Sequence, residues 1–522
     1  PFVWKSVKVR DLIDSLYQGY PIGYIITWKN PSVRLKNGEL GGGKQVLIDG
    51  QQRVTALMAA VLGMEVVDES YKKRRIKIAF HPLEERFETL TPAIRNSKGW
   101  VHDISEFLQT QSRFSYLRSF LNENEYTEEE QKLVEERLEK LEAVKNKDIG
   151  IVELDDKLEI EAVTEIFVRI NSAGVPLEQA DFAMSKIASY EPEDNPLYGV
   201  NLRKMIDYFA HLVRSPYFLE DIARNDSEFA QSRYLEKISW LGKEKDMSLY
   251  EPDYKDILRV SFVKEFRRGK VSDLVKLLSG QNFETREYDQ SKQVESYVML
   301  LNGLLDFMSP THFKRYLMIL ESAGFIDSSL INSQNVRNMG YVVYLLLRQD
   351  GMEDDLIEKY VRKWLVISIL TERYSSSPES VMDRDIRDIT IKGIKQVIQD
   401  IEAVDLSDTY WEYGLVKDLE KGTMNNPFLK LYFAAQVFMK DSVLFSKNMK
   451  VEQVIRHRGD VHHIFPRKYL QDLGFKRNEY NQIANLVYLQ QEVNIRIGKK
   501  SPAEYFPEFT DYERGSGGLN SN

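Results

Sequence analysis

The sequence contains no cysteine among its 522 residues. Disulfide bonds, thiol catalysis and cysteine-ligated zinc are therefore excluded, and the composition fits a cytoplasmic protein. The sequence also lacks the run of roughly 18 apolar residues that a membrane-spanning helix needs. The best runs, 341–347 and 364–370, are short, so we expect no membrane partner. The sequence opens at Pro1 with neither a methionine nor a secretory signal, so we expect the natural product to begin upstream.

An excess of positive charge is also missing. The net charge of −9 argues against nonspecific nucleic-acid binding by the whole surface. Residues 445–522, however, carry 12 Lys/Arg and 9 Asp/Glu, so this end is +3 and the remainder is −12. A mildly basic end on an acidic body is compatible with a DNA-cleaving module on a larger scaffold, and equally with ordinary surface variation.

Histidine is scarce, yet two of the seven are adjacent, at His462 and His463, and Pro466 follows them. Asn485 lies 22 residues after His463, and Asn494 lies 9 residues further on. In a β-hairpin followed by a helix, this spacing returns both asparagines to the histidine pair. Neighbouring side chains of a strand point to opposite faces, so one imidazole can bind a divalent metal while the other deprotonates a water. The alternative is a packed or solvated histidine pair, with Asn485 capping a turn.

The segments HHIFP and NLVYL, followed by Asn494, resemble the His-His variant of the HNH (ββα-metal) nuclease motif. This resemblance implies that His463 is the general base and that His462 and Asn494 are metal ligands. It further implies that Asn485 braces the loop. The implied cofactor is a divalent ion such as Mg²⁺, and the implied substrate is DNA.

Three basic residues follow Asn494 closely, namely Arg496, Lys499 and Lys500. We predict that they contact DNA phosphates. The alternative is solubilising surface charge.

Near the N-terminus, the sequence Asp49-Gly50-Gln51-Gln52-Arg53 lies between a predicted strand at 45–48 and a predicted helix at 54–62. Gly50 permits a sharp turn, and a helix N-terminus offers unpaired amides to an anion. Arg53 adds a bidentate phosphate donor, and Asp49 is placed to orient a metal or a water. These residues alone are equally compatible with a capped turn and a surface arginine.

The segment DGQQR, with PIGYIITW upstream and FVW at the N-terminus, resembles the DGQQR family of ParB-like domains. This family includes the nucleotide-hydrolysing parts of GmrSD-type modification-dependent restriction enzymes and of SspE-type phosphorothioate-sensing defence proteins. A second match begins at Phe167 and contains Arg169 and Asn171. The resemblance implies a nucleoside triphosphate as ligand. We predict that Arg169 and Asn171 converge with Arg53 on one anion, in a corner where Asn171 also caps the following helix.

We predict a multidomain α+β protein that is mostly helical. Its parts are an N-terminal ParB-like α/β nucleotide-binding domain (1–190), a helical linker or recognition domain (191–440), a C-terminal ββα-metal (HNH) nuclease module (441–514) and a disordered tail (515–522). Thr127 and Glu130 form a predicted capping box that opens an acidic helix with a buried stripe at Leu133, Leu138 and Leu141. The helices predicted in the middle include 202–213, 271–278, 294–307, 336–348, 356–370 and 386–401.

The predicted function is a metal-dependent DNA endonuclease or nickase coupled to nucleotide binding or hydrolysis. The resemblance places it in defence against foreign or differently modified DNA. Two alternatives remain open: a nucleotide-regulated DNA-binding effector with an inactive nuclease site, or a nuclease whose activity resides in the N-terminal domain. The expected partners are DNA and a nucleoside triphosphate, and a homo-oligomer is left open.

Overall fold

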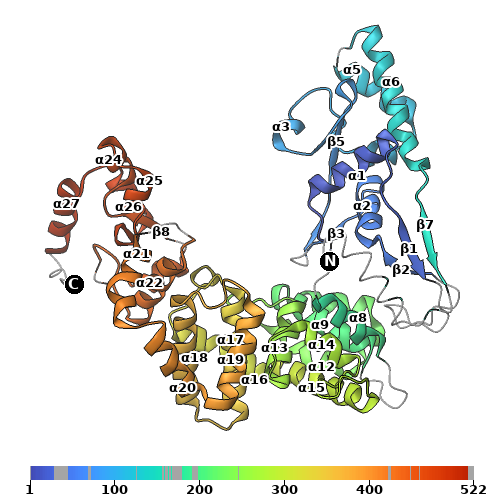
Figure 1. Ribbon diagram of the computed structural model, residues 1–522. Helices are drawn as coiled ribbons and strands as arrows, with labels where there is room; N and C mark the ends of the chain where they lie inside the picture. The colour runs from blue at the N-terminus through green and yellow to red at the C-terminus, as the bar shows by residue number, and fades with distance from the viewer. Residues whose placement is uncertain are drawn as a thin grey trace. The chain divides into compact units, whose positions relative to one another are not determined.

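The computed structural model describes residues 2–28, 45–68, 72–124, 126–155, 158, 163, 166, 179–190, 198–244, 246–420, 425–446, 448–457 and 459–514. The chain forms two compact units, Pro1–Leu177 and Glu178–Asn522, and is mostly helical (Figure 1). The prediction of a mostly helical, multidomain protein is thereby confirmed, while the predicted tail at 515–522 lies outside the described residues. None of the described helices is long and apolar enough to cross a membrane.

The first unit combines three small sheets with short helices. Its three-stranded sheet has the order β2-β1-β7, in which β1 is antiparallel to β2 and parallel to β7. The pairs β3-β4 and β5-β6 form two further antiparallel sheets. The elements are α1 (Ser6–Gln18), β1 (Ile25–Trp28), β2 (Val46–Asp49), α2 (Gln51–Val61), β3 (Val66–Val67), β4 (Lys73–Arg74), β5 (Ile78–His81), η1 (Pro82–Glu84), β6 (Arg86–Thr89), α3 (Pro92–Arg95), α4 (Ile104–Leu108), α5 (Arg113–Asn124), α6 (Glu128–Glu142), η2 (Ala143–Asn146) and β7 (Ile151–Leu154).

The core of this unit forms around one face of α1. The buried residues of α1 recur at helical spacing, so one stripe of the helix faces inward. The same hydrophobic cluster contains the alanines of α2 and Phe80 and Phe87 of the β5-β6 sheet. The small side chains of the alanines allow a close approach. The Tyr17 ring lies 5.3 Å from each of these two phenylalanine rings. The buried α1 residues are Val9, Leu12, Ile13, Leu16 and Tyr17.

The capping box predicted for the acidic helix is confirmed. The backbone N–H of Thr127 donates to Glu130 at 2.8 Å, and the backbone N–H of Glu130 donates to the Thr127 hydroxyl at 3.4 Å. The predicted buried stripe is wrong at Leu133, which is 42% exposed. Val134 is buried in its place, because 134, 138 and 141 share one helical face, whereas 133 lies about 100° away from 134.

Helices dominate the second unit. Those predicted in its middle are confirmed to within a few residues, except for 386–401, which Gly393 divides with φ of 79°. The elements up to the C-terminal module are α8 (Gln179–Ser189), α9 (Val200–Arg214), α10 (Phe218–Asn225), α11 (Ser227–Ala230), α12 (Arg233–Ile238), η3 (Ser239–Lys243), α13 (Tyr254–Phe266), α14 (Val271–Leu278), α15 (Gln290–Phe307), α16 (Pro310–Ser322), η4 (Ser328–Leu330), α17 (Gln334–Gln349), α18 (Asp354–Leu370), α19 (Pro378–Lys392), α20 (Ile394–Val404), η5 (Tyr410–Gly414), α21 (Leu415–Leu419), α22 (Pro427–Phe438) and α23 (Val451–Arg456).

The core of the second unit contains an aromatic cluster whose hydroxyl groups are hydrogen-bonded. Tyr316 and Tyr341 stack with ring centroids 4.8 Å apart. The Tyr341 hydroxyl donates to the backbone oxygen of Phe307 at 2.8 Å, and the Tyr316 hydroxyl donates to that of Arg337 at 2.6 Å. The rings therefore contribute large apolar area without leaving these polar atoms unpaired.

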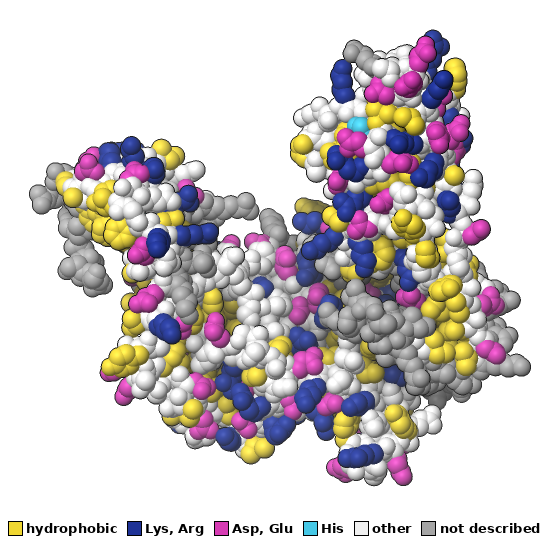
Figure 2. Space-filling view, turned by 45° about the horizontal axis from the view of Figure 1, so that its top comes forward, with side chains coloured by type: hydrophobic (Ala, Val, Ile, Leu, Met, Phe, Trp, Pro, Cys, Tyr) yellow, Lys and Arg dark blue, Asp and Glu magenta, His cyan; other side chains and the backbone are white. Residues whose placement is uncertain are grey.

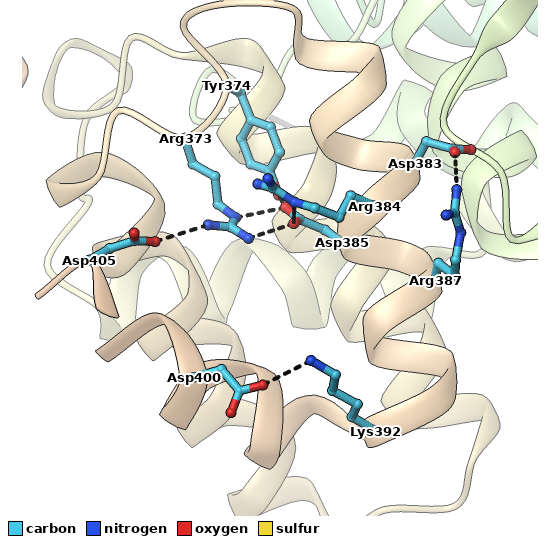
Figure 3. Close-up of polar contacts among 9 residues, drawn as sticks. All are labelled: Arg373, Tyr374, Asp383, Arg384, Asp385, Arg387, Lys392, Asp400 and Asp405. Atoms are coloured by element: carbon cyan, nitrogen blue, oxygen red, sulfur yellow. Dashed lines mark hydrogen bonds and ion pairs between the residues drawn. The ribbon is translucent and has the colours of Figure 1, made fainter. Parts of the chain in front are cut away.

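A buried ion pair joins the segment after α18 to α19 (Figure 3). Asp385 is fully buried and accepts from Arg373 Nε at 2.7 Å and from Arg373 Nη2 at 2.5 Å. The hydroxyl of Tyr374, also buried, donates to the same carboxylate at 2.9 Å. These three donors compensate the desolvation of the Asp385 charge, so the carboxylate depends on its partners for stability.

Candidate functional site

Residues 460–497 fold into an antiparallel hairpin followed by a helix. The strand β8 (Asp460–His463) pairs with β9 (Leu486–Leu489), with His462 opposite Val487 and His463 opposite Leu486. Helix α26 (Gln491–Ile497) follows and carries Asn494, so the predicted hairpin is followed by the predicted helix. The excursion between the strands contains α24 (Arg467–Asp472), α25 (Arg477–Tyr480) and the turn η6 (Ile483–Asn485).

A small core holds this module together. Leu489 and Ile497 are buried against Tyr505 and Phe509 of the last helix, α27 (Pro502–Arg514). The Tyr505 hydroxyl donates to the backbone oxygen of Ile464 at 2.5 Å. Because a two-stranded hairpin alone is only marginally stable, these contacts are what fix the ends of β8 and α26.

His462 is almost fully buried, with 4% of its surface exposed. Its Nδ1 lies 2.5 Å from Asn494 Oδ1 and donates, since an amide oxygen only accepts. Its Nε2 is buried and has no hydrogen-bond partner among the described residues. Burial lowers the pKa of His462 below its ordinary value, although the contact with Asn494 acts in the opposite direction. The ring is therefore neutral near pH 7, which is the form that ligates metals.

His462 and Asn494 offer one imidazole nitrogen and one amide oxygen to a metal. No group of three His, Cys, Asp or Glu that could hold an ion lies within the described part of the chain. For Nδ1 and Oδ1 to hold one ion together, the proton that Nδ1 donates in this hydrogen bond would have to move to Nε2, which has no other hydrogen-bond partner among the described residues. The pair fits a hydrated ion that takes its other ligands from water and phosphate.

Asn485 connects the two ends of the excursion. Its Oδ1 accepts from the backbone N–H of Phe465 at 2.7 Å, just beyond β8. Its Nδ2 donates to the backbone oxygens of Phe465 and Tyr480, at 3.2 and 2.9 Å. Asn485 lies in the turn before β9, and its three bonds hold the chain that follows the histidine pair.

His463 is half-buried and follows His462 on the strand, so the two side chains leave opposite faces. Its Nε2 lies 2.8 Å from Oδ1 of Asn481, a residue that the sequence analysis did not select. The fold therefore brings the histidine pair together with Asn494, Asn485 and Asn481.

A cleft of about 310 Å³ opens at this module, with both histidines and Asn494 on its wall. Arg467 and Lys468 add positive charge to it, and neither was predicted from the sequence. Their position directly after the HHIFP segment is the signal that could have revealed them. The lining residues are Val461, His462, His463, Pro466, Arg467, Lys468, Gln471, Asn494 and Gly498.

The three basic residues selected from the sequence lie on or just after α26 and are not among the residues that line this cleft. The Arg496 guanidinium lies 5.0 Å from the centre of the Phe509 ring. Lys499 is exposed, while Lys500 donates to both carboxylate oxygens of Glu508, at 2.7 and 2.8 Å. Figure 2 shows basic side chains interspersed with acidic ones over the visible face, so the positive charge there lies in small groups of side chains.

In the first unit, the predicted strand-to-helix junction is confirmed, since β2 ends at Asp49 and α2 begins at Gln51. Gly50 has φ of 100°, in the left-handed region. A Cβ atom there would lie 3.3 Å from Ile25 Cγ1 and 3.4 Å from Ile25 Cα. Glycine is therefore required at this turn for both its backbone conformation and the space it leaves.

Arg53 is tethered within its own unit. Its Nη2 donates to Asp49 Oδ2 at 2.9 Å, and its Nη1 donates to the backbone oxygen of Tyr24. A guanidinium has five N–H donors, so others remain for an anion. Gln52 accepts from the backbone N–H of Val3 at 3.0 Å, and Gln51 donates to the backbone oxygen of Leu47 at 3.4 Å. The other predicted nucleotide-binding residues, Arg169 and Asn171, lie outside the described residues.

The comparison with protein families concerns the first unit and the start of the second. Residues 1–188 match the family model described as the N-terminal domain of the GmrSD restriction endonuclease. The Asp49–Arg53 junction lies within this match. The match supports a GmrSD-type protein, as the sequence analysis predicted, whereas the ParB-like and HNH assignments stay predictions.

A relative extends the similarity beyond this domain. The chain is 23% identical to the uncharacterized protein MJ0686 of Methanocaldococcus jannaschii, over 552 aligned positions. The alignment covers 99% of this chain and 84% of that protein, so the C-terminal module also lies almost entirely within it.

Proposed function

We propose that this chain is a restriction-type DNA endonuclease or nickase that cuts, with a divalent metal, in the cleft beside His462 and His463. We further propose that a nucleoside triphosphate bound at Asp49–Arg53 regulates cutting. The observation that carries the proposal is the convergence of His462, His463 and Asn494 on one cleft. The GmrSD match of residues 1–188 independently favours a restriction nuclease, which implies DNA as the partner.

In the proposed reaction, His463 takes a proton from a water molecule, and the water oxygen attacks the phosphorus. The new P–O bond forms as the bond to the 3′-oxygen breaks, and the leaving oxygen takes a proton from solvent. A divalent ion at His462 and Asn494 would stabilise charge on the phosphate and on the leaving oxygen. Arg467 and Lys468 hold the phosphate in the cleft, and Asn485 maintains the shape of the loop.

Cleavage of supercoiled plasmid with Mg²⁺ or Mn²⁺, with and without chelator, tests the proposal. The DNA should include unmodified, methylated, hydroxymethylated and phosphorothioate forms. We expect cutting that requires the metal and depends on modification. The proposal fails if none of these DNAs is cut under any metal and nucleotide condition, or if cutting persists in chelator.

The charge of the cleft gives a prediction for DNA binding. Replacing Arg467 and Lys468 together by glutamine should weaken binding and make its salt dependence shallower. The slope of log K against log salt is negative, and its magnitude should decrease by about 0.9 for each DNA phosphate that the variant no longer neutralises. Fluorescence anisotropy with a short duplex, titrated at several salt concentrations, measures the slope.

The pair Lys499 and Lys500, replaced in the same way, provides the comparison for that experiment. We expect a smaller change in slope for this pair, because Arg467 and Lys468 line the cleft and Lys499 and Lys500 do not. An unaltered slope for both double variants would return all four residues to solubilising surface charge.

A second prediction concerns the nucleotide. Arg53→Ala should weaken triphosphate binding by about 1.5–3 kcal/mol, or roughly ten- to more than a hundredfold, because it removes a charge-assisted hydrogen bond to the phosphate. Asp49→Ala should lower hydrolysis more than binding. Calorimetric titration with ATP and GTP, beside a phosphate-release assay, measures both effects.

Arg86→Ala is the matched control, since this arginine of the same unit is 55% exposed and pairs with an exposed glutamate. It should bind nucleotide like the parent. If Arg53→Ala and Asp49→Ala also behave like the parent, the junction is only a structural turn.

A further inference from the structure

We propose that Asn481 is a positioning residue for the cleavage reaction, because it fixes which nitrogen of His463 carries the proton. The expected effect of Asn481 on cleavage rests on the proposed function, in which His463 is the general base. The tautomer assigned to His463 is independent of that function. The geometry that carries it is the contact of 2.8 Å between His463 Nε2 and Asn481 Oδ1.

The chemistry of the two groups determines the direction of this contact. An amide oxygen can only accept a hydrogen bond, so the His463 Nε2 must be protonated and donate. A neutral imidazole has one donor nitrogen and one acceptor nitrogen, so the lone pair of His463 then lies on Nδ1. Nδ1 is therefore the nitrogen that receives the proton from water in the proposed reaction. Without the Asn481 oxygen, the imidazole can adopt either tautomer. Only the tautomer that is protonated at Nε2 has a lone pair at Nδ1 to accept the proton.

Asn481 is itself held in place by the turn on which it lies. Its backbone N–H donates to the backbone oxygen of Arg477 at 3.1 Å, at the C-terminal end of α25. The preceding residue, Tyr480, is buried, and its backbone oxygen accepts from Asn485 Nδ2 at 2.9 Å. Asn485 also binds both backbone polar groups of Phe465, two residues after His463. One amide thus fixes the distance between the segment that carries the imidazole and the segment that carries its acceptor.

Three variants separate this role from simple packing. Asn481→Leu keeps the side-chain volume but removes the oxygen, and Asn481→Asp keeps an oxygen acceptor. Asn478→Leu, on the exposed surface of α25 just before Asn481, is the matched control. We expect Asn481→Leu to lower the single-turnover cleavage rate at saturating DNA by about 10–100-fold, the range found when the hydrogen-bond partner of a metal-ligating histidine is removed. DNA affinity should not change, Asn481→Asp should recover most of the rate, and Asn478→Leu should cut like the parent.

The tautomer can be observed directly on the full chain labelled with ¹⁵N-histidine, without DNA or metal. The chain has seven histidines, and the signals that disappear in His463→Ala assign His463. We expect His463 to be protonated at Nε2 in the parent and in Asn481→Asp, and to lose this preference in Asn481→Leu.

Two results would overturn the inference: protonation of His463 at Nδ1 in the parent, or cleavage by Asn481→Leu at the parental rate. If Asn481→Leu does not fold, the parent spectrum and the Asn481→Asp rate still decide the question. Failure of the proposed function has a different signature, because cutting would then survive His463→Ala while the parent tautomer is still found.

Discussion

His463→Ala is expected to lower DNA cleavage by roughly 10²–10⁴-fold, the range that a general base contributes. The substitution removes the nitrogen that accepts the proton of the attacking water. It leaves the small core beneath the hairpin intact, because Leu489, Ile497, Tyr505 and Phe509 are untouched. Nucleotide hydrolysis should be unchanged, since the proposed nucleotide site lies in the other compact unit. Single-turnover cleavage of end-labelled duplex at saturating metal measures the loss.

His457→Ala is the matched control, because this histidine is exposed at the end of α23 in the same module. His462→Ala should lower the rate and also raise the metal concentration needed for half-maximal cutting. Equal rates for His463→Ala and the parent would remove His463 as the base. They would favour the alternative that the N-terminal domain cuts, or that the C-terminal site is inactive.

Asp385→Ala is expected to lower the free energy of unfolding of the second unit by about 3–5 kcal/mol, the cost of breaking a buried ion pair. The substitution leaves the Arg373 guanidinium, which is 9% exposed, without its principal partner. It also removes the acceptor of the buried Tyr374 hydroxyl. Urea unfolding monitored by circular dichroism measures the loss as a lower midpoint.

The neighbouring pair of Lys392 and Asp400 supplies the control for this experiment (Figure 3). Both of its side chains are more than 40% exposed, so Asp400→Ala should leave the urea midpoint close to that of the parent. Similar losses for the two substitutions would mean that the Asp385 network contributes no more than a surface pair does.

The helices were predictable from sequence wherever periodicity and capping agreed. Thr127 and Glu130 marked one helix start, and the bounds of α14 were predicted without error. Gly393 was missed because the apolar spacing on either side of it suits one continuous helix. A glycine within a helix lowers its stability without specifying that the chain must turn there. Only the observed φ of 79° shows the division.

The candidate site was predictable to the extent that short-range spacing determines it. The alternation of a strand and the distance to Asn485 and Asn494 suggested the hairpin and the helix. The contact with Asn481 depends on the path of the chain through α24 and α25, for which no spacing rule exists. The sequence likewise indicates that Arg53 can donate to an anion, but its bonds to Asp49 and Tyr24 required the fold.

The small core beneath the hairpin has a consequence for how short an autonomous cutting fragment can be. The last of the residues proposed for the chemistry is Asn494. The core extends further along the chain, because Tyr505 and Phe509 of α27 supply half of its four buried side chains. A fragment that stops before Pro502 would retain all the proposed chemistry and lose the side chains of α27 that pack against β9 and α26. The motif is therefore smaller than its folding unit, and α27 would support the proposed site mechanically although it contributes no reacting group.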